Sequence, residues 1–547
     1  MHESGTSLTR TAIDLRRFPW FSRLASDYAY AFESLAPFYA GNPASPADWR
    51  DAIARTTGLP RDRDRLVNAL TAQQDRRGAP GAAAASAERQ RDPRAVAVVT
   101  GQQAGVFGGP LYTLLKAVTA IQLAARTTRE FGVPAVPVFW IDAEDHDWDE
   151  VASTVVLDGD ARTRTLTLPR PNGAGAVSVA SVRLDAGVTA LVDELRQTLA
   201  PTEFSDEVLA LVAEAYRPGE GMADAFGRWL EKLLGPMGLV LYDCADPATK
   251  PLAADVFSHE FKHPGRTFDL ASRAGEALEA LGYHAQVAPH PGGVALFHLD
   301  GGRHAVRHED GRYVAGHRGY GADEMEALAK SAPEQFSPNV LLRPLVQDAT
   351  FPTVCYVGGP AELAYLGQLR GVYEHFGIPM PLVHPRATAT IIDAAAARFL
   401  QKYSVPLETL RPQDEAELNR LLEAQLPASV EQSLHDATEA VQARMAAVVA
   451  AVPLIDPTLE GAARSTLGKM EHDLRTLHSK IIHAAKKRDE TLRRQYNRAR
   501  VQAFPDGHPQ ERTLGFVFFL NRYGPALVDL LARELPMDLG RHWVLTL

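Results

Sequence analysis

The sequence predicts an α/β protein in which a doubly wound parallel-sheet core, interrupted by two insertions, is followed by an α-helical antiparallel hairpin. Three observations carry this prediction. From residue 94 onward, short continuous apolar runs typical of buried strands alternate with helix-like segments. Two stretches of alternating apolar and polar residues interrupt this pattern. After Pro385, apolar residues recur at spacings of three and four along two long segments.

The core begins with a strand at Ala95–Val99 (AVAVV), a Gly-rich turn and a helix over Leu111–Ala125. Ala135–Ile141 (AVPVFWI) is the next expected strand, and a strand–helix–strand unit of this kind is normally parallel and right-handed. Further core strands are expected at Met237–Cys244, Val340–Leu345 and Thr353–Val357.

Alternating residues predict inserted hairpins at Thr163–Leu184 and at Ala295–His308, the second turning at Asp300–Gly302. Apolar stripes at 430–452 and 467–481, with Pro453 and Pro457 between them, predict two long antiparallel helices and a plausible dimer contact. Gly78–Ser86 is expected to be a flexible connector. The predicted divisions are an N-terminal helical segment (1–90), the first half of the core (91–155), a first insertion (156–235), a core continuation (236–290), a second insertion (291–336), the second half of the core (337–395), a helical coiled-coil domain (396–505) and a C-terminal segment docking on the core (506–547).

Composition narrows the class of protein. The chain has 547 residues, 46% of them hydrophobic, and a net charge of −10, which argues against a nucleic-acid binder. The N-terminus lacks a secretory h-region and no stretch is long and apolar enough for a membrane span, so a cytoplasmic protein is expected. Cys244 and Cys355 lie in strand-like contexts and are expected to be reduced core thiols, with a catalytic or metal-binding role as the alternative.

The first candidate site is the loop Thr100–Tyr112 (TGQQAGVFGGPLY), which follows a strand and precedes a helix. Ligands bind at such strand ends in open α/β sheets, glycines permit close backbone approach, and the free N–H groups of a helix start favour an anion. The loop matches neither the P-loop nor the dinucleotide fingerprint, so a mere turn is the alternative. The candidate substrate-binding residues here are Thr100, Gly101, Gln102, Gln103, Gly108, Gly109, Tyr112 and Lys116.

The second candidate is Asp142–Glu150 (DAEDHDWDE), which directly follows a predicted strand. Carboxylates crowded this closely raise one another's pKa values unless a cation or hydrogen-bond donor compensates. His146 is a candidate general base, oriented by Asp145 or Glu144. Asp147 and Trp148 are candidate substrate contacts. A solvated surface loop is one alternative. A divalent metal site is another, for which one histidine among carboxylates is a weak signature, so no metal ligand is assigned.

The third candidate, Asn339–Tyr365, contains a second Gly-Gly-Pro and an arginine suited to carboxylate or phosphate binding, with a salt bridge at the core edge as the alternative. Its candidate residues are Arg343, Gln347, Asp348, Gly358, Gly359 and Glu362. A basic helical stretch, Lys486–Arg494, is interpreted as a solvated helix face or as a nucleotide phosphate site that uses Lys486, Arg493 and Arg494.

These motifs, together with ERTLGFVFFLNRYGPALVDLL near the C-terminus, resemble the bacillithiol biosynthesis cysteine-adding enzyme family, BshC, over nearly the whole chain. The resemblance implies a Rossmann-like core similar to that of class I aminoacyl-tRNA synthetases, and a coiled coil that supports a homodimer. It implies a ligase that joins cysteine to the amine of glucosaminyl malate, with an ATP or ADP site. The HIGH and KMSKS signatures of the synthetases are absent, and so is an evident zinc site for the cysteine thiol.

Amide formation from a free carboxylate needs activation, so roles follow for the candidate residues. We expect the loop over 100–109 to hold an anionic group, His146 with Asp145 to accept a proton from the amine, and Arg343 to neutralise a substrate carboxylate. The alternatives are a metal- or nucleotide-dependent hydrolase or sugar-modifying enzyme that uses the acidic cluster, and a non-enzymatic protein in which the helical hairpin is the working part.

Overall fold

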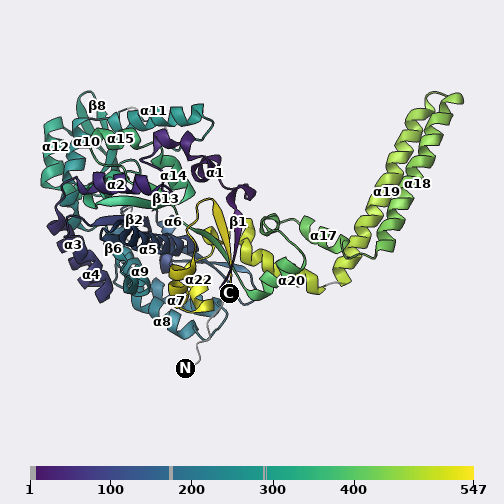
Figure 1. Cartoon of the computed structure of the whole chain (residues 1–547), viewed down its shortest axis with the longest axis horizontal. Helices are drawn as coiled ribbons and strands as arrows, with labels where there is room; N and C mark the ends of the chain where they lie inside the picture. The colour runs from purple at the N-terminus through teal and green to yellow at the C-terminus, as the bar shows by residue number, and fades with distance from the viewer. Residues whose placement is uncertain (1–7, 172–176, 288–289, 291, 489) are drawn as a thin grey trace. The chain divides into compact units, whose positions relative to one another are not determined.

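The computed structural model describes residues 8–171, 177–287, 290, 292–488 and 490–547, with the side chains of 485–488 left out of the description. The chain divides into two compact units: Met1–Thr390 with Gln510–Leu545, and Ile391–Pro509 with Thr546–Leu547. The first unit holds an α/β core, and the second is helical (Figure 1).

The core is a five-stranded parallel sheet in the order β13-β12-β2-β3-β6. The predicted strands at 95–99, 135–141, 237–244 and 353–357 are confirmed. The central strand β2 pairs with β3 along its whole length, from Val96 opposite Ala135 to Gln103 opposite Asp142. The chain leaves β2 first toward β3 and later toward β12, so a topological switch point lies at the carboxyl end of β2. The strands are β2 Val96–Gln103, β3 Ala135–Asp142, β6 Val240–Asp243, β12 Thr353–Gly358 and β13 Leu382–Pro385.

Alternation along β2 gives the sheet two buried faces. Val96 and Val98 pack in one cluster with residues of α5 (Leu111–Phe131) and with Trp49 of α2 (Pro46–Thr57). Ala97 and Val99 belong to the cluster on the opposite face, which includes residues of α1 (Arg23–Tyr30), α3 (Arg63–Arg77) and α4 (Gly81–Arg89). Burial on both sides explains why this strand is continuously apolar.

The predicted strand at Val340–Leu345 is wrong, because α13 (Arg343–Thr350) begins inside it. Asn339 Oδ1 accepts the N–H groups of Leu341 and Leu342 and turns the chain, and Pro344 fits the first turn of a helix. The apolar residues here are buried on a helix face, which a short run cannot distinguish from a strand. Arg343, Gln347 and Asp348 therefore lie on a helix.

The first insertion contains a hairpin of β4 (Ser153–Leu157) and β5 (Thr163–Thr167). The hairpin predicted over Thr163–Leu184 is wrong in its pairing, since β5 pairs with the preceding strand. The Asp158 carboxylate accepts the N–H groups of Asp160 and Arg162 and so stabilises that earlier turn. Residues 172–176 of the predicted hairpin lie outside the described residues.

The second insertion is an antiparallel sheet in the order β10-β9-β8-β7-β11. Its β7–β8 hairpin confirms the prediction at 295–308. The strands of this sheet are β7 Gly293–Leu299, β8 Arg303–Glu309, β9 Arg312–Ala315, β10 Arg318–Tyr320 and β11 Phe336–Pro338. A separate three-stranded sheet consists of β1 Thr9–Asp14, β15 Arg541–Thr546 and β14 Thr388–Ile392.

The predicted connector Gly78–Ser86 is wrong in part. Gly78 ends α3 at φ 73°, but α4 begins at Gly81 and includes the run of alanines that follows it.

Near the C-terminus, α22 (Phe516–Tyr523) and α23 (Leu527–Glu534) pack on α5. The Gln122 side chain of α5 donates to the carbonyl groups of Ala532 and Leu535, both at 2.9 Å. The remaining helices of this unit are α6 Trp148–Val151, α7 Gly187–Thr198, α8 Ser205–Ala215, α9 Met222–Leu234, α10 Ala254–Lys262, α11 Arg266–Ala280, α12 Ala322–Ser331, α14 Pro360–Leu366, α15 Arg370–Phe376 and α21 Gln510–Thr513.

The second unit confirms the predicted antiparallel helical hairpin, formed by α18 (Ala428–Ala451) and α19 (Leu459–Arg488). Gln442 donates a hydrogen bond to Glu471 at 2.9 Å, and Glu431 lies 3.2 Å from His478. Residue numbers on α19 therefore decrease as those on α18 increase, as expected for an antiparallel pair. Its other helices are α16 Ala394–Lys402, α17 Ala416–Glu423 and α20 Glu490–Ala503.

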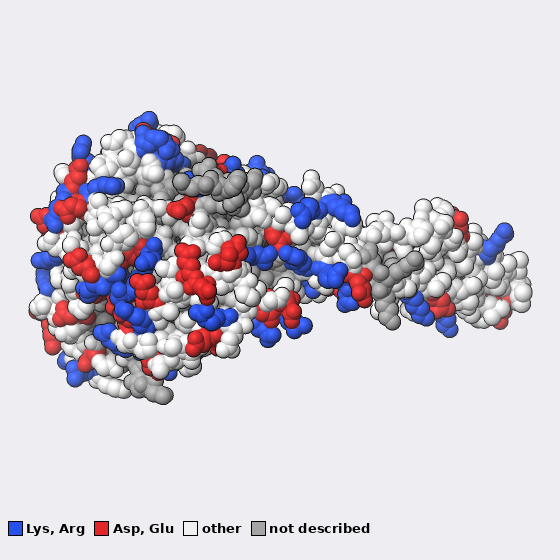
Figure 2. Space-filling view, turned by 90° about the horizontal axis from the view of Figure 1, so that it is seen from below, with Lys and Arg blue, Asp and Glu red and all other residues white. Residues whose placement is uncertain are grey.

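Basic and acidic side chains are interspersed on the face seen in Figure 2, in keeping with the mixed composition. Among the described helices, none combines the length and the apolar character that crossing a membrane requires.

Candidate active site

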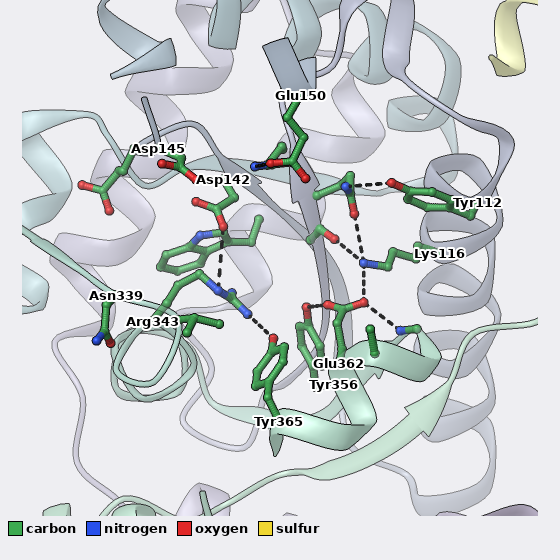
Figure 3. Close-up of a pocket in the computed structure, with 18 of the residues that line it drawn as sticks. Tyr112, Lys116, Asp142, Asp145, Glu150, Asn339, Arg343, Tyr356, Glu362 and Tyr365 are labelled. Atoms are coloured by element: carbon green, nitrogen blue, oxygen red, sulfur yellow. Dashed lines mark hydrogen bonds and ion pairs between the residues drawn. The ribbon is translucent and has the colours of Figure 1, made fainter. Parts of the chain in front are cut away.

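A cavity of about 430 Å³ opens at the carboxyl edge of the parallel sheet, over the switch point at β2. Its walls come from the ends of β2, β3 and β12 and from the first turns of α5, α13 and α14 (Figure 3). The lining is unusually rich in charged and hydrogen-bonding groups. It consists of Gly101, Gln102, Gln103, Tyr112, Lys116, Trp140, Asp142, Glu144, Asp145, Glu150, Arg303, Pro338, Asn339, Val340, Arg343, Tyr356, Gly359, Pro360, Ala361, Glu362, Tyr365, Arg386 and Arg512.

One side of the cavity is built on a buried ion pair. Lys116 Nζ lies 2.5 Å from Glu362 Oε2 and donates to the Gly101 carbonyl at 2.9 Å and to Gln102 Oε1 at 3.1 Å. Glu362 also accepts the Tyr356 hydroxyl and the Gly359 N–H, at 2.5 and 2.7 Å. Burial lowers the pKa of Lys116. Burial also acts to raise the pKa of Glu362, but the ammonium group and the hydrogen bonds from Tyr356 and Gly359 together outweigh it and lower that pKa. Both members of this pair are therefore fully hydrogen-bonded within the protein.

The opposite side carries a looser pair. Arg343 Nε lies 3.8 Å from Asp142 Oδ2, too far for a hydrogen bond, while Arg343 Nη2 donates to the Tyr365 hydroxyl at 3.0 Å. Burial raises the pKa of Asp142, and Arg343 opposes the rise. Figure 3 shows the Asp142 carboxylate and the Arg343 guanidinium facing each other across this wall. A carboxylate and a guanidinium with capacity for further bonds therefore border the same space.

Two more acidic residues of the predicted cluster are paired with cations. Glu144 contacts Lys250 Nζ, and both side chains are at least nine-tenths buried. Burial raises the pKa of Glu144, and Lys250 opposes the rise. Asp145 Oδ1 accepts from Arg303 Nη1 at 3.0 Å at a more exposed position. The crowding of carboxylates after β3 is thus compensated by cations from distant parts of the chain.

Two arginines lie at the rim of the cavity and differ in whether a carboxylate is paired with them. Arg386 is held by Glu511 through two bonds of 3.0 and 2.7 Å and lies over the Tyr112 ring. Arg512 is exposed, lines the cavity and forms no ion pair with any of the residues described. Arg386 is therefore a structural cation, and Arg512 is available to an anion.

The structure brings together residues from all three predicted segments. Ten of the sequence-predicted residues line the cavity: Gly101, Gln102, Gln103, Tyr112, Lys116, Glu144, Asp145, Arg343, Gly359 and Glu362.

Four of the predicted residues of the Gly-rich motifs, Thr100, Gly108, Gly109 and Gly358, do not line the cavity. Gly108 is packed so tightly that an added Cβ would lie 2.2 Å from the Phe516 ring, and the Gly109 carbonyl accepts the Phe516 N–H. The first N–H of α5, from Leu111, donates to the Leu514 carbonyl at 2.8 Å, so the protein itself occupies this donor. Thr100 donates to the Val357 carbonyl between strands, and the Gly358 carbonyl accepts the Arg386 N–H.

His146, Asp147 and Trp148 lie beside the cavity and not in its lining. The His146 side chain is 55% exposed, and its Nδ1 is 3.1 Å from Asp145 Oδ1. Asp147 caps α6 by accepting the Glu150 N–H, and Trp148 is buried with its indole N–H on the Leu168 carbonyl.

Gln347 and Asp348 stand behind Arg343. Gln347 Oε1 accepts from Arg343 at 3.3 Å, and its amide donates to Asp348 at 2.9 Å. Asp348 also accepts the Tyr373 hydroxyl at 2.5 Å. Burial raises the pKa of Asp348 to about 6. These residues orient the guanidinium from outside the cavity.

The predicted nucleotide residues belong to the helical unit. The Lys486 side chain lies outside the described residues. Arg493 is exposed, 4.0 Å from Glu415. Arg494 lines a groove of about 450 Å³ between α16 and α20. The other residues of this groove are Ala395, Ala396, Arg398, Phe399, Lys402, Thr491, Gln495 and Arg498.

Sequence reasoning did not single out several lining residues. Asp142 stood in the acidic cluster, and its place as the last residue of β3 was the signal that could have distinguished it. Arg512 belongs to the C-terminal motif, but nothing local indicates that this motif reaches the switch point. Arg303 and Tyr365 come from an insertion strand and a helix whose positions depend on the tertiary fold.

The fold and the site define a two-domain α/β enzyme: a Rossmann-like core with a charged pocket at its switch point, followed by a coiled coil. The model of the bacillithiol biosynthesis BshC N-terminal Rossmann-like domain matches residues 8–387, and that of the BshC C-terminal coiled-coil domain matches 389–547. The chain belongs to the BshC family and is an enzyme of the ligase class, which confirms the resemblance seen in the sequence.

Relatives that bear the name "Putative cysteine ligase BshC" match over nearly their full length. The protein of Salinibacter ruber is 35% identical, with 96% of each chain covered. That of Chlorobaculum tepidum is 33% identical over 94% of this chain and 95% of its own. That of Koribacter versatilis is 34% identical over 95% and 96%.

Proposed function

We propose that this ligase forms an amide between the carboxyl group of cysteine and the amine of glucosaminyl malate. The observation that carries the proposal is the open Arg343–Asp142 pair in a cavity whose rim holds Arg512, which has no ion-pair partner among the described residues. These groups complement a carboxylate, an amine and a dianionic malate. The names of the relatives support cysteine as one substrate.

The carboxyl group of cysteine would lie against Arg343. The guanidinium is nine-tenths buried, and its long contact with Asp142 leaves donor capacity on the cavity side. A buried guanidinium binds a carboxylate strongly and stabilises the negative charge that develops on its oxygen during attack. Tyr365 and Gln347 fix the direction of the donors.

The amine would lose its proton to Asp142. At neutral pH the amine arrives as an ammonium ion and must be deprotonated before it can attack. Asp142 lines the cavity, and its raised pKa makes it a better proton acceptor than an ordinary aspartate. His146 with Asp145 remains the competing candidate from the sequence, and its exposed position beside the cavity favours Asp142.

The malate group would face Arg512. This arginine has no carboxylate partner among the described residues, in contrast to Arg386. An exposed guanidinium at a pocket mouth steers and holds an anionic group, so it would contribute mainly to substrate binding.

A nucleotide, ATP or ADP, would bind in the groove between α16 and α20. The residues present fit such a ligand: Arg398, Lys402, Arg494 and Arg498 suit phosphate groups, and Phe399 offers an apolar wall. Arg498 is partly committed, with Asp393 at 2.6 Å. When bound, ATP would supply the activation that a free carboxylate needs, so that a phosphate group or AMP, and not hydroxide, leaves the carboxyl carbon when the amine attacks. Loss of nucleotide binding in Arg494→Ala, measured by calorimetry with ADP, supports this site, and unchanged binding contradicts it.

The helical hairpin would join two copies of the chain. No residue of α18 is buried, and Val448, Met470 and Leu477 stay 40–47% exposed on the paired helices. A second copy would cover this apolar seam. Light scattering on size-exclusion fractions tests it: a dimer that becomes a monomer in Leu477→Lys is expected, and a monomeric native chain contradicts it.

The central experiment incubates the purified enzyme with cysteine, glucosaminyl malate and ATP, and then omits each in turn, with mass spectrometry of the products. Amide formation only with both substrates is expected. Product that forms equally well without ATP would refute activation by the nucleotide, and no amide under any condition would refute the proposed function.

A further inference from the structure

Three histidines meet on the face of the first unit where the ends of α10 and α15 adjoin. His259 lies in the last turn of α10 and His263 directly follows that helix, while His375 lies in the last turn of α15. One ring nitrogen from each lies within 4.8 Å of one from each of the others. None of the three lines the cavity at the switch point.

The uncommitted ring nitrogens are the main evidence for a ligand. Among the residues that the structure describes, no hydrogen-bond partner reaches the buried Nε2 atoms of His259 or His375. His263 Nδ1 lies 3.0 Å from the His259 carbonyl, which can only accept, so Nδ1 carries the proton and Nε2 keeps its lone pair. Metal-bound histidines are oriented by this kind of bond to a backbone carbonyl.

Aromatic packing holds the rings of His259 and His375 in place. The Phe376 ring packs against both, with centroids 4.5 and 5.5 Å away. Lys262 is paired with Glu326 and so does not bring an uncompensated charge to the cluster.

The sequence here, His-Glu-Phe-Lys-His at 259–263, matches the His-Glu-x-x-His pattern, in which two histidines one helical turn apart bind zinc and the glutamate is a general base. The second role does not fit. Glu260 is buried, and its two oxygens accept the Ala295 N–H and the Thr267 hydroxyl. The metal-binding half of the pattern is thus present, while the glutamate serves the packing of α10 on β7.

We propose that His259, His263 and His375 bind one divalent zinc-class cation that ties α10 to α15. Tetrahedral zinc holds its nitrogens about 3.3 Å apart, so the rings must close from the separation seen here. His263 is exposed and can rotate to do so. A water completes the shell, because no fourth protein ligand belongs to this group among the described residues. The effect is on stability and is independent of the proposed ligase chemistry.

The test uses tag-free, chelator-treated full-length protein and zinc alone as the probe. Calorimetry is expected to give one zinc per chain, and Tm is expected to rise by several degrees with zinc. Cobalt substituted for zinc is expected to show the visible absorption of a tetrahedral site. His263→Gln, at an exposed position where folding is unaffected, should weaken zinc binding by at least about 10-fold.

His375→Gln provides a second ligand variant. His435→Ala provides a matched control, because His435 is exposed on α18 and its ion-pair partner among the described residues is Glu439. The control should bind zinc as the native chain does. The proposal is overturned if the native chain binds no zinc, or if both glutamine variants bind it with unchanged stoichiometry and affinity.

Discussion

Each side of the cavity carries one basic side chain facing one carboxylate, but the first pair is in close contact and the second is not. On one side Lys116 and Glu362 lie 2.5 Å apart, and four further hydrogen bonds from or to the protein surround them. On the other side Arg343 and Asp142 lie 3.8 Å apart. A saturated pair fixes the shape of a site, whereas an unsaturated one can exchange its contacts for those of a ligand. The difference separates residues that hold the site together from residues that act in it.

The largest expected effect follows from Asp142→Asn. The amide keeps the shape but cannot accept the proton, so kcat should fall by about 10²–10⁴-fold, the usual contribution of a general base. Circular dichroism and Tm should stay near those of the native enzyme. Because burial raises the pKa of Asp142, native activity should be lost, as pH falls, at a higher pH than for an ordinary aspartate.

His146→Ala is the matched control for that change. If Asp142 is the base, the alanine variant should retain most of its turnover and the same pH profile. A collapse of kcat in His146→Ala, with Asp142→Asn nearly active, would transfer the role to the sequence-predicted histidine.

Breaking the Lys116–Glu362 pair should reduce the stability of the fold more than it reduces catalysis. Lys116→Met leaves the Glu362 carboxylate buried without its cation, which should reduce the free energy of unfolding by about 3–5 kcal/mol. The double variant Lys116→Met with Glu362→Leu should be less damaging than either single change. Chemical denaturation measures both effects. A Lys116→Met enzyme of native stability would contradict the structural role of the pair.

A smaller effect on stability, which depends on pH, is expected at Asp348, behind the Arg343–Asp142 pair. The folded-state pKa of Asp348 is raised to about 6 from an ordinary value near 4, so folding favours the protonated form. Its contribution to stability is complete below the ordinary value and is lost as pH rises through about 6, by on the order of 3 kcal/mol. Asp348→Asn should therefore gain stability relative to the native chain between pH 4 and 7, measured as a Tm difference. A difference independent of pH would refute this.

The parts of the fold that the sequence predicted are those with a local signature. The apolar run at 95–99 and the heptad-like stripes need only their own periodicity, and the hairpin at 295–308 needs only alternation and a Gly-rich turn. Leu341–Leu345 could not be assigned in this way, because a short buried helix and a short buried strand have the same apolar character.

Within the site, Lys116, Arg343 and Glu362 were predicted because their residue types stand out in Gly-rich or polar motifs at strand ends. Their states could not be predicted. Whether a charge is committed depends on partners more than 200 residues away, as for Lys116 with Glu362 and for Arg343 with Asp142. His375 and His259 are closer in sequence, 116 residues apart, but they too meet only in the tertiary fold.

The smallest effect is expected at the rim of the cavity. Here too one cation, Arg386, is paired with a carboxylate, whereas Arg512 is available to a ligand. Arg512→Ala removes an exposed guanidinium that has no ion-pair partner in the described part of the chain. Stability should therefore stay the same, and KM for the amine substrate should rise by about 10-fold, equivalent to about 1.4 kcal/mol. KM for cysteine should not change, because that substrate is assigned to Arg343. Steady-state kinetics with each substrate varied in turn separates the two constants, and a higher KM for cysteine alone would reverse the assignment of the two ends of the cavity.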